Sequence, residues 1–232
     1  MHILLTRPLE DCKDMIMNFK KLGHMVSHLP LLSIEKVNHE KLNYEEFSGI
    51  IFTSTNAIKF LDTKNINKNI SCFTVGDSTE NKAKKYGFQN IFSANGSVYN
   101  LCEIILQNFK NTEGKLLYIS GEAITFDLDK ELLKENYNIK RLINYKARQI
   151  TNFNIEIIEQ LKKQIPDIVY IYSENSAKSF LNLIKNNNLK NIWMNTNLMC
   201  IGEKTSRILN EIKWKKIFLF NPGDEEYLLY KI

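Results

Sequence analysis

Short apolar runs alternate with amphipathic stretches along most of the chain. The stretch from Ile50 to Leu61, IIFTSTNAIKFL, is the clearest case, because an apolar run stops at a Thr-Ser-Thr-Asn cluster and then resumes with helical spacing. This pattern predicts a buried strand, a tight polar turn and a helix. Repeated alternation of strands and helices is typical of α/β proteins, in which helices cover both faces of a parallel sheet.

The same plan recurs in the second half of the chain. Val169 to Leu181, VYIYSENSAKSFL, again runs from an apolar segment through a polar cluster into a helical pattern, with Ser173 in the place of Ser54. A second pair follows, VGDST at Val75 to Thr79 and IGEKT at Ile201 to Thr205. Each is a Gly-x-x-Thr between an apolar segment and a polar helical one. The duplication predicts two related halves built from strand-turn-helix units.

Two extended runs without turn signals, residues 34–38 and 142–150, frame the middle of the chain. If they pair, they form a two-stranded linker. The first domain is then discontinuous, with residues 1–33 and 151–232, and residues 39–141 form a second, inserted domain. We therefore expect two similar doubly wound parallel-sheet domains joined by a two-stranded β linker.

Local signals define several element ends. Glu10 to Leu22 has helical spacing and should end at Gly23. Ser120-Gly121 is expected to turn the chain after an apolar strand. The stretch from Thr205 to Ile212 is polar and amphipathic, and it predicts a helix.

The composition fits an ordinary globular protein. The 232 residues are 44% hydrophobic and 25% charged, and the chain is long enough for two independent cores. No apolar run approaches the roughly 18 residues that cross a bilayer, and the N-terminus MHILLTRP does not have the pattern of a secretory signal. We expect a cytoplasmic protein that does not contact a membrane.

Cysteine and histidine spacing gives no reason to expect a metal site. The cysteines occur singly, with no C-x-x-C pair, and are expected to be reduced core residues; they are Cys12, Cys72, Cys102 and Cys200. His24 and His28 are four residues apart, but Gly23 should already have ended the helix that could pair them. The net charge of +5 is compatible with an anionic partner. Without an RNP pattern, a zinc finger or a dense arginine patch, nucleic acid is not expected.

Polar turns mark the candidate site. In an open parallel sheet, ligands bind beyond the carboxyl ends of the strands, and free N–H groups at helix N-termini suit phosphate or carboxylate. The turns expected there are residues 53–56, 76–79, 120–121, 173–176 and 202–205. Two such lobes facing each other would line one cleft. The alternative is that Ser54, Thr79, Ser176 and Thr205 only cap their own helices.

The chain lacks the sequence motifs of several enzyme classes. The chain contains no G-x-G-x-x-G, no G-x-x-x-x-G-K-[ST] and no G-x-S-x-G. Dinucleotide, kinase and serine-hydrolase chemistry are therefore weak interpretations. An anion-binding cleft without cofactor, metal or strong nucleophile suits a reaction that depends on positioning and on the loss of a good leaving group.

At this point a set of motifs resembles the uroporphyrinogen-III synthase family, in order and over the whole chain. The motifs are ILLTRP at the start, FTSTNAI, VGDST followed by Gly87, the apolar strand ending at Gly121, NYKA at Asn144 to Ala147, YSENSA and IGEKT. The resemblance implies two α/β domains joined by a two-stranded linker. It implies cyclisation of hydroxymethylbilane, a linear tetrapyrrole polycarboxylate, to uroporphyrinogen III, with inversion of ring D and loss of water, in heme biosynthesis.

The resemblance also implies that no cofactor or metal is needed. It suggests a monomer and allows a transient contact with the preceding enzyme of the pathway. Tyr145 matches the family tyrosine on the second linker strand, which is proposed to help the substrate hydroxyl leave as water; the alternative is an aromatic that packs in the hinge. The positions implied to bind substrate are Arg7, Thr53, Ser54, Asn56, Gly76, Ser78, Thr79, Gly121, Ser173, Ser176, Gly202, Lys204 and Thr205.

The sequence departs from the family pattern at two places. Many members have an arginine shortly after the glycine that corresponds to Gly121, whereas here the run is EAITFDL. Glu203 stands where smaller residues are common, and it would repel a carboxylate unless it points away. A rival function is a two-lobed binding or sensory module for a small anionic ligand, which would share the lobes and the hinge but would not need Tyr145.

Overall fold

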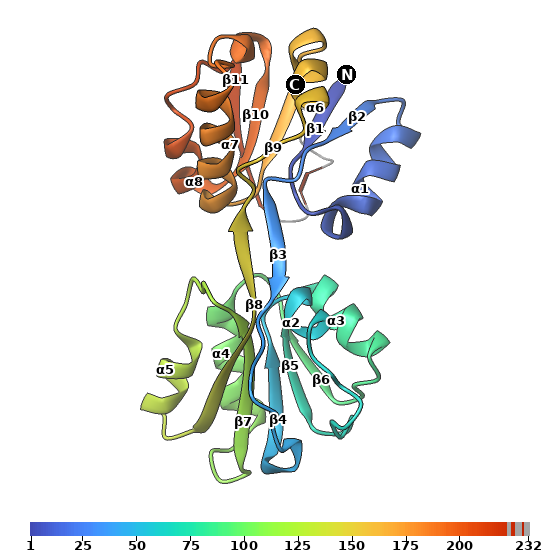
Figure 1. The fold of residues 1–232 in the computed structure, drawn as a ribbon. Coiled ribbons are helices and arrows are strands. Elements are labelled where there is room, and N and C mark those ends of the chain that lie inside the picture. Colours follow the sequence, from blue (N-terminus) through green and yellow to red (C-terminus); the bar gives the residue numbers. More distant parts are fainter. Residues whose placement is uncertain (222–223, 226–228, 230–232) are drawn as a thin grey trace. The chain divides into compact units, whose positions relative to one another are not determined.

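The chain folds into two compact units (Figure 1). The structure is a computed structural model that describes residues 1–221, 224–225 and 229. Unit 1 contains Met1–Ser33 and Arg148–Ile232, and unit 2 contains Ile34–Ala147. Each unit is built on its own sheet, and the α/β class that the alternating pattern predicts is confirmed, with a parallel sheet in unit 1 and a mainly parallel, mixed sheet in unit 2.

Unit 1 has a five-stranded sheet in the order β11-β10-β9-β1-β2, with parallel pairs throughout. Its strands are β1 (His2–Leu5), β2 (Met25–His28), β9 (Ile168–Ile171), β10 (Asn197–Ile201) and β11 (Lys216–Phe220). Its helices are α1 (Leu9–Lys21), α6 (Ile155–Lys163), α7 (Glu174–Asn186) and α8 (Gly202–Ile208), with a 3-10 turn at Ile192–Asn195.

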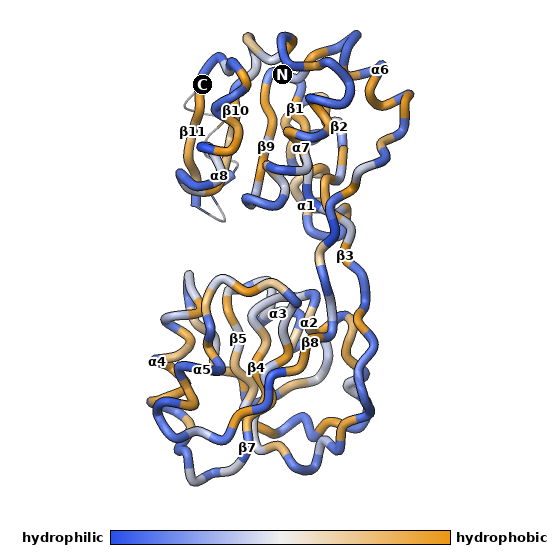
Figure 2. The backbone as a smooth tube through the Cα atoms, turned by 60° about the vertical axis from the view of Figure 1, so that its left-hand side comes forward, coloured by the Kyte–Doolittle hydropathy of each residue, from blue (hydrophilic) through white to orange (hydrophobic). Residues whose placement is uncertain are grey.

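Helices cover both faces of the unit 1 sheet, and successive strand residues therefore enter two different cores. Leu4 packs with α6 and α7, whereas Ile3 and Leu5 pack with α1. Every residue of β1 and β9 is buried, which explains why these strands are apolar throughout instead of alternating. Figure 2 shows these strands as hydrophobic segments between more polar helices and loops.

Unit 2 has a six-stranded sheet in the order β3-β8-β7-β4-β5-β6. Its strands are β3 (Leu32–Lys36), β4 (Phe47–Phe52), β5 (Ser71–Val75), β6 (Ile91–Ala94), β7 (Lys115–Gly121) and β8 (Asn138–Gln149). Its helices are α2 (Thr55–Lys59), α3 (Asp77–Lys85), α4 (Val98–Asn108) and α5 (Leu128–Lys134), with a 3-10 turn at Tyr44–Glu46. One core lies between the sheet and the α2–α3 side, and a second lies between the sheet and α4 and α5.

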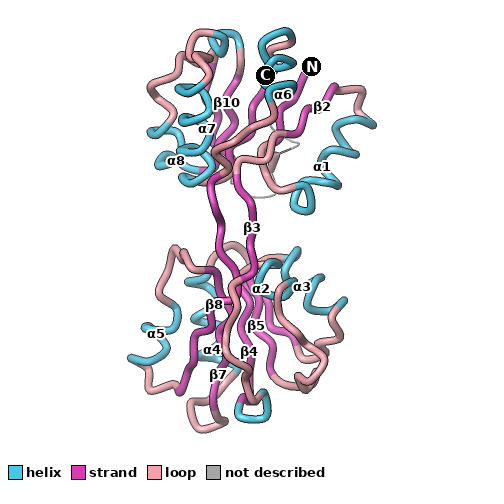
Figure 3. Tube along the Cα trace, viewed as in Figure 1, coloured by secondary structure: helices cyan, strands magenta, loops and turns pink. Residues whose placement is uncertain are grey.

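The chain passes between the units inside β3 and β8, which are hydrogen-bonded neighbours (Figure 3). The Val37 N–H donates to the Asn144 carbonyl at 2.9 Å, and the Ile150 N–H donates to the Leu31 carbonyl at 3.0 Å. From Leu31 to Val37 the residue numbers rise, whereas those of the hydrogen-bonded partners fall from Ile150 to Asn144. The two runs are therefore antiparallel. The expected linker segments, 34–38 and 142–150, overlap these strands.

Two local expectations are wrong. Ser120 and Gly121 do not turn the chain, because the pairing of β7 with β8 continues through Gly121. The helix expected from Thr205 to Ile212 instead begins at Gly202 and ends at Ile208. Gly202 has φ +69°, which lets the chain turn directly from β10 into the helix.

Two other local expectations are confirmed, the end of the first helix and the state of the cysteines. Helix α1 is followed by Gly23 at φ +80°, as predicted for a glycine that ends a helix. All four cysteines are free and buried. Within the described part of the chain, no helix has the length and apolar character needed to cross a membrane.

Candidate active site

The strand register of unit 2 brings polar strand ends into one row. Continuing the register of β4 by two residues places Ser54 level with Gly121, the last residue of β7, and with Gly76, which follows β5. Gly121 is in turn paired with Tyr145 of β8. Four residues that are far apart in the sequence therefore lie side by side at the carboxyl end of the sheet, where parallel α/β proteins bind ligands.

Tyr145 closes this row at the β8 end. Its ring packs partly buried against the core on the α2–α3 side, next to Gly121. Its backbone carbonyl accepts a hydrogen bond from the Glu122 N–H at 2.9 Å. The backbone and the ring of Tyr145 are thus both held against the end of β7.

Ser54 begins helix α2. Its backbone is extended, with φ −155° and ψ 147°, and its Oγ accepts a hydrogen bond from the Asn56 N–H at 3.2 Å. The preceding Thr53 has its Oγ1 3.4 Å from the phenolic oxygen of Tyr118. Burial raises the pKa of Tyr118, so this phenol stays protonated and can donate to Thr53. The turn therefore presents hydroxyl and amide groups. The contacts of Thr53 with Tyr118 and of Ser54 with the Asn56 N–H hold it in place.

Gly76 begins helix α3 at φ +75°, a conformation that glycine adopts without steric cost. Its carbonyl accepts hydrogen bonds from the N–H groups of Thr79 and Glu80, both at 3.1 Å. Ser78 is exposed in the first turn of the helix, whereas Thr79 is only 4% exposed. Ser78 is thus accessible to a ligand, and Thr79 faces inward.

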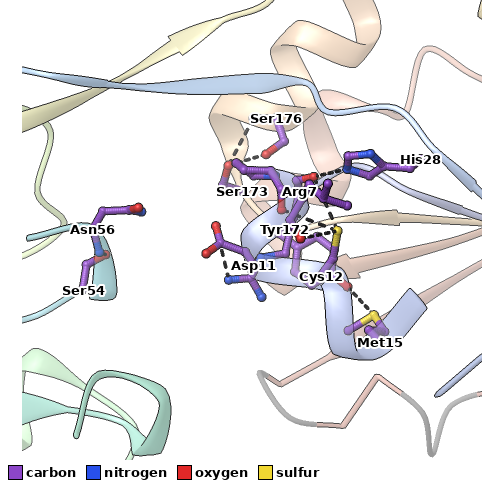
Figure 4. Close-up of polar contacts among 12 residues, drawn as sticks. Arg7, Asp11, Cys12, Met15, His28, Ser54, Asn56, Tyr172, Ser173 and Ser176 are labelled. Atoms are coloured by element: carbon purple, nitrogen blue, oxygen red, sulfur yellow. Dashed lines mark hydrogen bonds and ion pairs between the residues drawn. The ribbon is translucent and has the colours of Figure 1, made fainter. Parts of the chain in front are cut away.

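Unit 1 has a corresponding row at the ends of its central strands. Ser173 after β9 lies level with Gly202 after β10 when the strand register is continued by two residues. Ser173 accepts a hydrogen bond from the Ser176 N–H at 3.1 Å, and the two hydroxyl oxygens are 2.7 Å apart (Figure 4). Ser173 therefore caps α7 in the same way that Ser54 caps α2.

Arg7 follows β1 and lies level with Tyr172 in the same sheet. Its guanidinium lies 4.9 Å from the centroid of the Tyr172 ring, and Nη2 lies 4.0 Å from Oδ2 of Asp11 (Figure 4). Burial raises the pKa of Tyr172 far above its usual value, so the ring beneath the cation stays neutral. The Arg7 carbonyl lies 2.8 Å from Nε2 of His28. Arg7 is thus a partly exposed cation whose backbone and side chain are both fixed.

The turn after β10 carries both signs of charge. Lys204 is exposed, and Thr205 is only 4% exposed. The Glu203 carboxylate accepts a hydrogen bond from Nη2 of Arg207 at 3.0 Å. Because Arg207 neutralises this carboxylate, Glu203 repels an anion at Gly202 less than its sequence position suggests.

The capping alternative is correct for only one of its four residues. Ser54 does cap its helix, but Ser173 rather than Ser176 caps α7. Thr79 and Thr205 lie inside their helices, because the N-cap positions of these helices are Gly76 and Ile201. The reason is local: a glycine with positive φ makes the sharp turn itself, and the helix starts before the threonine.

Sequence reasoning did not identify Arg141 as part of this end of unit 2. Its Nε donates to Ser120 Oγ at 2.8 Å, and its Nη2 donates to the carbonyls of Gly121 at 2.9 Å and Glu122 at 3.2 Å. It brings a guanidinium to the end of β7, where the run after Gly121 contains no arginine. Only the register of β8 against β7 could have placed it there, and no local signal fixes that register.

Asn144, within the motif NYKA, is a second residue of this site that the sequence pattern does not reveal, and it is fully buried. Its Nδ2 donates to the Ala57 carbonyl in α2 at 2.7 Å. The described residues contain no group of three or more His, Cys, Asp or Glu side chains that could hold a metal ion.

Together, the fold and the rows define the class of protein: an α/β protein with two parallel-sheet units, in which polar turns gather at the carboxyl ends of central strands. Comparison with known proteins identifies the family. Residues 13–220 match the family described as uroporphyrinogen-III synthase HemD, and the chain belongs to this family.

One individual relative agrees with this assignment by its name. Over 229 residues the chain is 27% identical to the porphyrin biosynthesis protein HemD of Ruminiclostridium josui, covering 88% of this chain and 42% of that protein. It is 24% identical to an uncharacterised protein of Rickettsia prowazekii, over 99% of this chain and 97% of that one.

Solved structures show the same fold. The uroporphyrinogen-III synthetase of Helicobacter pylori matches with a TM-score of 0.64 at 20% identity, over 100% of this chain and 99% of that one. A mutant uroporphyrinogen III synthase of Thermus thermophilus matches with a TM-score of 0.53 at 12% identity, over 100% and 97%.

The family resemblance found in the sequence motifs is confirmed. Membership of this family assigns the protein to heme and tetrapyrrole biosynthesis and implies a cyclising lyase. The rival function, a two-lobed binding or sensory module for a small anion, is not favoured.

Proposed function

We propose that this protein converts hydroxymethylbilane into uroporphyrinogen III, with inversion of ring D and loss of one water molecule, and that it needs no cofactor or metal. The observation that carries this proposal is the row Tyr145, Gly121, Ser54 and Gly76 at the carboxyl end of one sheet. The row combines a phenolic proton donor with two glycine positions and a capped polar turn. A phenol can protonate a leaving hydroxyl, and free N–H groups at the start of a helix can bind carboxylates.

The carboxylates of the substrate find donors at the polar turns. In unit 2 we assign binding to Thr53, Ser54 and Asn56 at the start of α2, to Gly76 and Ser78 at the start of α3, and to the backbone at Gly121, while the buried Thr79 holds its turn. In unit 1 we assign binding to Arg7, Ser173, Ser176, Gly202 and Lys204, while the buried Thr205 holds its turn. Helix N-termini favour anions because free N–H groups and the helix dipole act together. Arg7 adds a full positive charge whose guanidinium is already held by Asp11 and Tyr172.

Tyr145 provides the proton for the first step. Its O–H bond breaks as the proton moves to the hydroxymethyl oxygen, and the carbon–oxygen bond breaks as water leaves. The lone pair of the adjacent pyrrole nitrogen supplies the electrons that expel the water. The resulting methylene carbon bonds to the substituted α carbon of ring D, and the bond from that carbon to the ring C methylene then breaks, which inverts ring D. The ring C methylene bonds to the free α carbon of ring D, and the proton that this carbon loses returns to the tyrosinate. One water is lost overall, and Tyr145 is regenerated.

The two units act as domains in this proposal, with boundaries at 1–33 plus 151–232 and at 39–141. The strands at 34–38 and 142–150 serve as the linker. The hydrogen bonds from Val37 to Asn144 and from Ile150 to Leu31 support the linker as a paired ladder. We propose that the protein works as a cytoplasmic monomer, with transient contact with the enzyme that supplies its unstable substrate.

The test uses purified full-length protein and hydroxymethylbilane generated by enzyme in the same vessel. After oxidation, the uroporphyrin isomers are separated by chromatography. We expect the type III isomer in excess over a reaction without this protein. If only the type I isomer of spontaneous closure forms, the proposed function is wrong.

A further inference from the structure

The strand β8 contains an extra residue directly before Tyr145. Ser120 of β7 pairs with Ile143, but the next residue, Gly121, pairs with Tyr145, so that Asn144 has no opposite partner. Such a β-bulge bends a strand and re-aims the side chains that follow it. Bulges of this kind are common next to active sites.

The bulge determines which face of the sheet Tyr145 occupies. Leu142 and Tyr145 both pack against the core on the α2–α3 side, although they are three residues apart. Strict alternation along a strand would place residues three apart on opposite faces. Without the bulge, Tyr145 would point toward α4 and α5 and would not lie against Gly121.

Asn144 fixes the bulge to two other elements of unit 2. Its Nδ2 donates to the Ala57 carbonyl at 2.7 Å, and its backbone carbonyl accepts from the Val37 N–H at 2.9 Å. Ala57 belongs to α2, which Ser54 caps. One fully buried residue thus connects the strand that carries Tyr145, the helix that begins at the polar turn, and the run after β3.

The polar side chain of Asn144 lowers the stability of the fold more than an apolar residue in the same place would. Its Oδ1 is buried and has no hydrogen-bond partner among the described residues. An unpaired buried acceptor lowers stability, whereas an apolar side chain of similar size would avoid this loss. We therefore attribute the presence of an amide at this position to the hydrogen bond that its N–H group donates to the Ala57 carbonyl.

We infer that Asn144 is a positioning residue for Tyr145. It holds the bulge that turns the phenol onto Gly121 and keeps that phenol in a fixed relation to the Ser54 turn. Asn144 acts through Tyr145 and does not itself touch the reacting atoms. This inference rests on the proposed function of Tyr145 as proton donor.

The experiment compares Asn144→Leu and Asn144→Ser with Asn197→Leu. Asn197 is a matched control, because it is also buried, has an Oδ1 without a partner among the described residues, and starts β10 at the end of the sheet far from the polar turns. Tyr145 is replaced by 3-fluorotyrosine in the full chain, so that a fluorine NMR signal reports the ring position without substrate. Steady-state kinetics are measured on the same variants without the label.

We expect the fluorine resonance to shift or broaden in both Asn144 variants and to stay unchanged in Asn197→Leu. We also expect kcat to fall by about 10-fold or more in the Asn144 variants, with KM within about 2-fold, because misplacing a catalytic group affects the chemical step. An unchanged fluorine signal, or equal losses of kcat in Asn144→Leu and Asn197→Leu, would overturn the inference. If neither Asn144 variant folds while Asn197→Leu does, Asn144 is a folding determinant and the positioning role is overturned. A wild-type protein that makes no type III isomer would refute the proposed function, and the fluorine signal would still test what Asn144 does to Tyr145.

Discussion

The ring of Tyr145 packs directly against Gly121 at the end of β7. A Cβ added to Gly121 would lie 2.8 Å from Cε2 and Cζ of Tyr145 and 3.0 Å from its hydroxyl oxygen. The backbone of Gly121 does not require glycine through a positive φ, since Gly121 is absent from the residues with that conformation. The close approach of the ring is therefore the reason that only glycine fits there.

Gly121→Ala should displace the Tyr145 ring and slow the reaction. The ring is a partly exposed side chain of β8, so it can move away from the new methyl group more easily than the backbone can. We expect kcat to fall by about 10²-fold, the effect of misplacing a catalytic group by about 1 Å. Turnover of hydroxymethylbilane into the type III isomer measures this change.

Gly49→Ala is the matched control for this substitution. Gly49 lies in β4 of the same sheet, and its added Cβ would lie 2.6 Å from Cδ2 of Leu116. That clash is in the core and does not involve Tyr145. It should lower the melting temperature more than Gly121→Ala does, and kcat at a temperature where the protein is folded should be unchanged. Equal kcat values for the two variants would refute the steric link between Gly121 and Tyr145.

Tyr145→Phe should remove the proton donor and leave the packing intact. The ring remains against Gly121, and only the hydroxyl is lost, so we expect the urea midpoint to stay close to that of the wild type. General acid catalysis contributes about 10² to 10⁴-fold, and we expect a loss of kcat in that range. A Tyr145→Phe enzyme with wild-type turnover would exclude the phenol as proton donor.

Local chemistry made part of this site predictable from the sequence. The cap at Ser54 follows from residue types within a few positions of each other, and so does the turn at Gly76. The same reasoning selected Ser176 for α7, where Ser173 is the cap. The alternation of apolar and amphipathic runs was likewise enough for the α/β class, because buried parallel strands have a distinctive apolar pattern.

Long-range register explains what the sequence did not reveal. The pairing of Gly121 with Tyr145 depends on how β8 aligns with β7, and the bulge at Asn144 reverses the face that simple alternation assigns to Tyr145. The clamp of Arg141 on Ser120 depends on the same alignment. No residue near either strand end carries a local signal for this alignment, so it emerges only from the folded sheet.

Ser54→Ala should affect both stability and substrate binding if the turn holds a carboxylate. Loss of the hydrogen bond to the Asn56 N–H costs about 1 kcal/mol in the free energy of unfolding, as for other N-cap serines. Ser97 caps α4 through the Asn100 N–H at 3.3 Å and provides a matched control outside the assigned site. We expect both alanine variants to lose similar stability and only Ser54→Ala to raise KM. A rise of KM by the same factor in both variants would show that Ser54 only caps its helix and does not bind substrate.

Arg7→Lys should weaken substrate binding more than it weakens folding. Lysine keeps the charge but loses the planar guanidinium that stacks on Tyr172 and can bind a carboxylate with two hydrogen bonds. We expect KM to rise by about 10-fold, corresponding to the loss of roughly one charge-assisted hydrogen bond. Arg207→Lys, at an exposed ion pair with Glu203, is the control and should leave KM unchanged. Equal KM values for wild type and Arg7→Lys would remove Arg7 from the binding site.

His2 should make the protein less stable in mild acid. Its side chain is only 7% exposed, and its Nε2 lies 2.8 Å from Ser27 Oγ. Burial lowers the pKa of His2 below 6.5, and the nearby Asp167 carboxylate opposes this shift without reversing it. The unfolded chain therefore binds a proton more readily than the folded one. The stabilisation from neutral His2 is complete above about pH 7.5 and is lost as the pH falls through about 6.5 toward the lower pKa of the folded state.

Urea unfolding of wild type and His2→Gln at pH 7.5, 6.5 and 5.5 measures this contribution. The two proteins share every other titratable group, so the difference between the two pH dependences isolates the contribution of His2. We expect the wild type to lose more free energy of unfolding between pH 7.5 and 5.5 than His2→Gln, because only the wild type must keep a buried imidazole neutral against a growing proton concentration. Parallel pH dependences in the two proteins would show that His2 takes up its proton equally in the folded and unfolded states. A steeper loss in His2→Gln would mean that His2 is protonated in the folded protein and paired with Asp167, the opposite of what its burial implies.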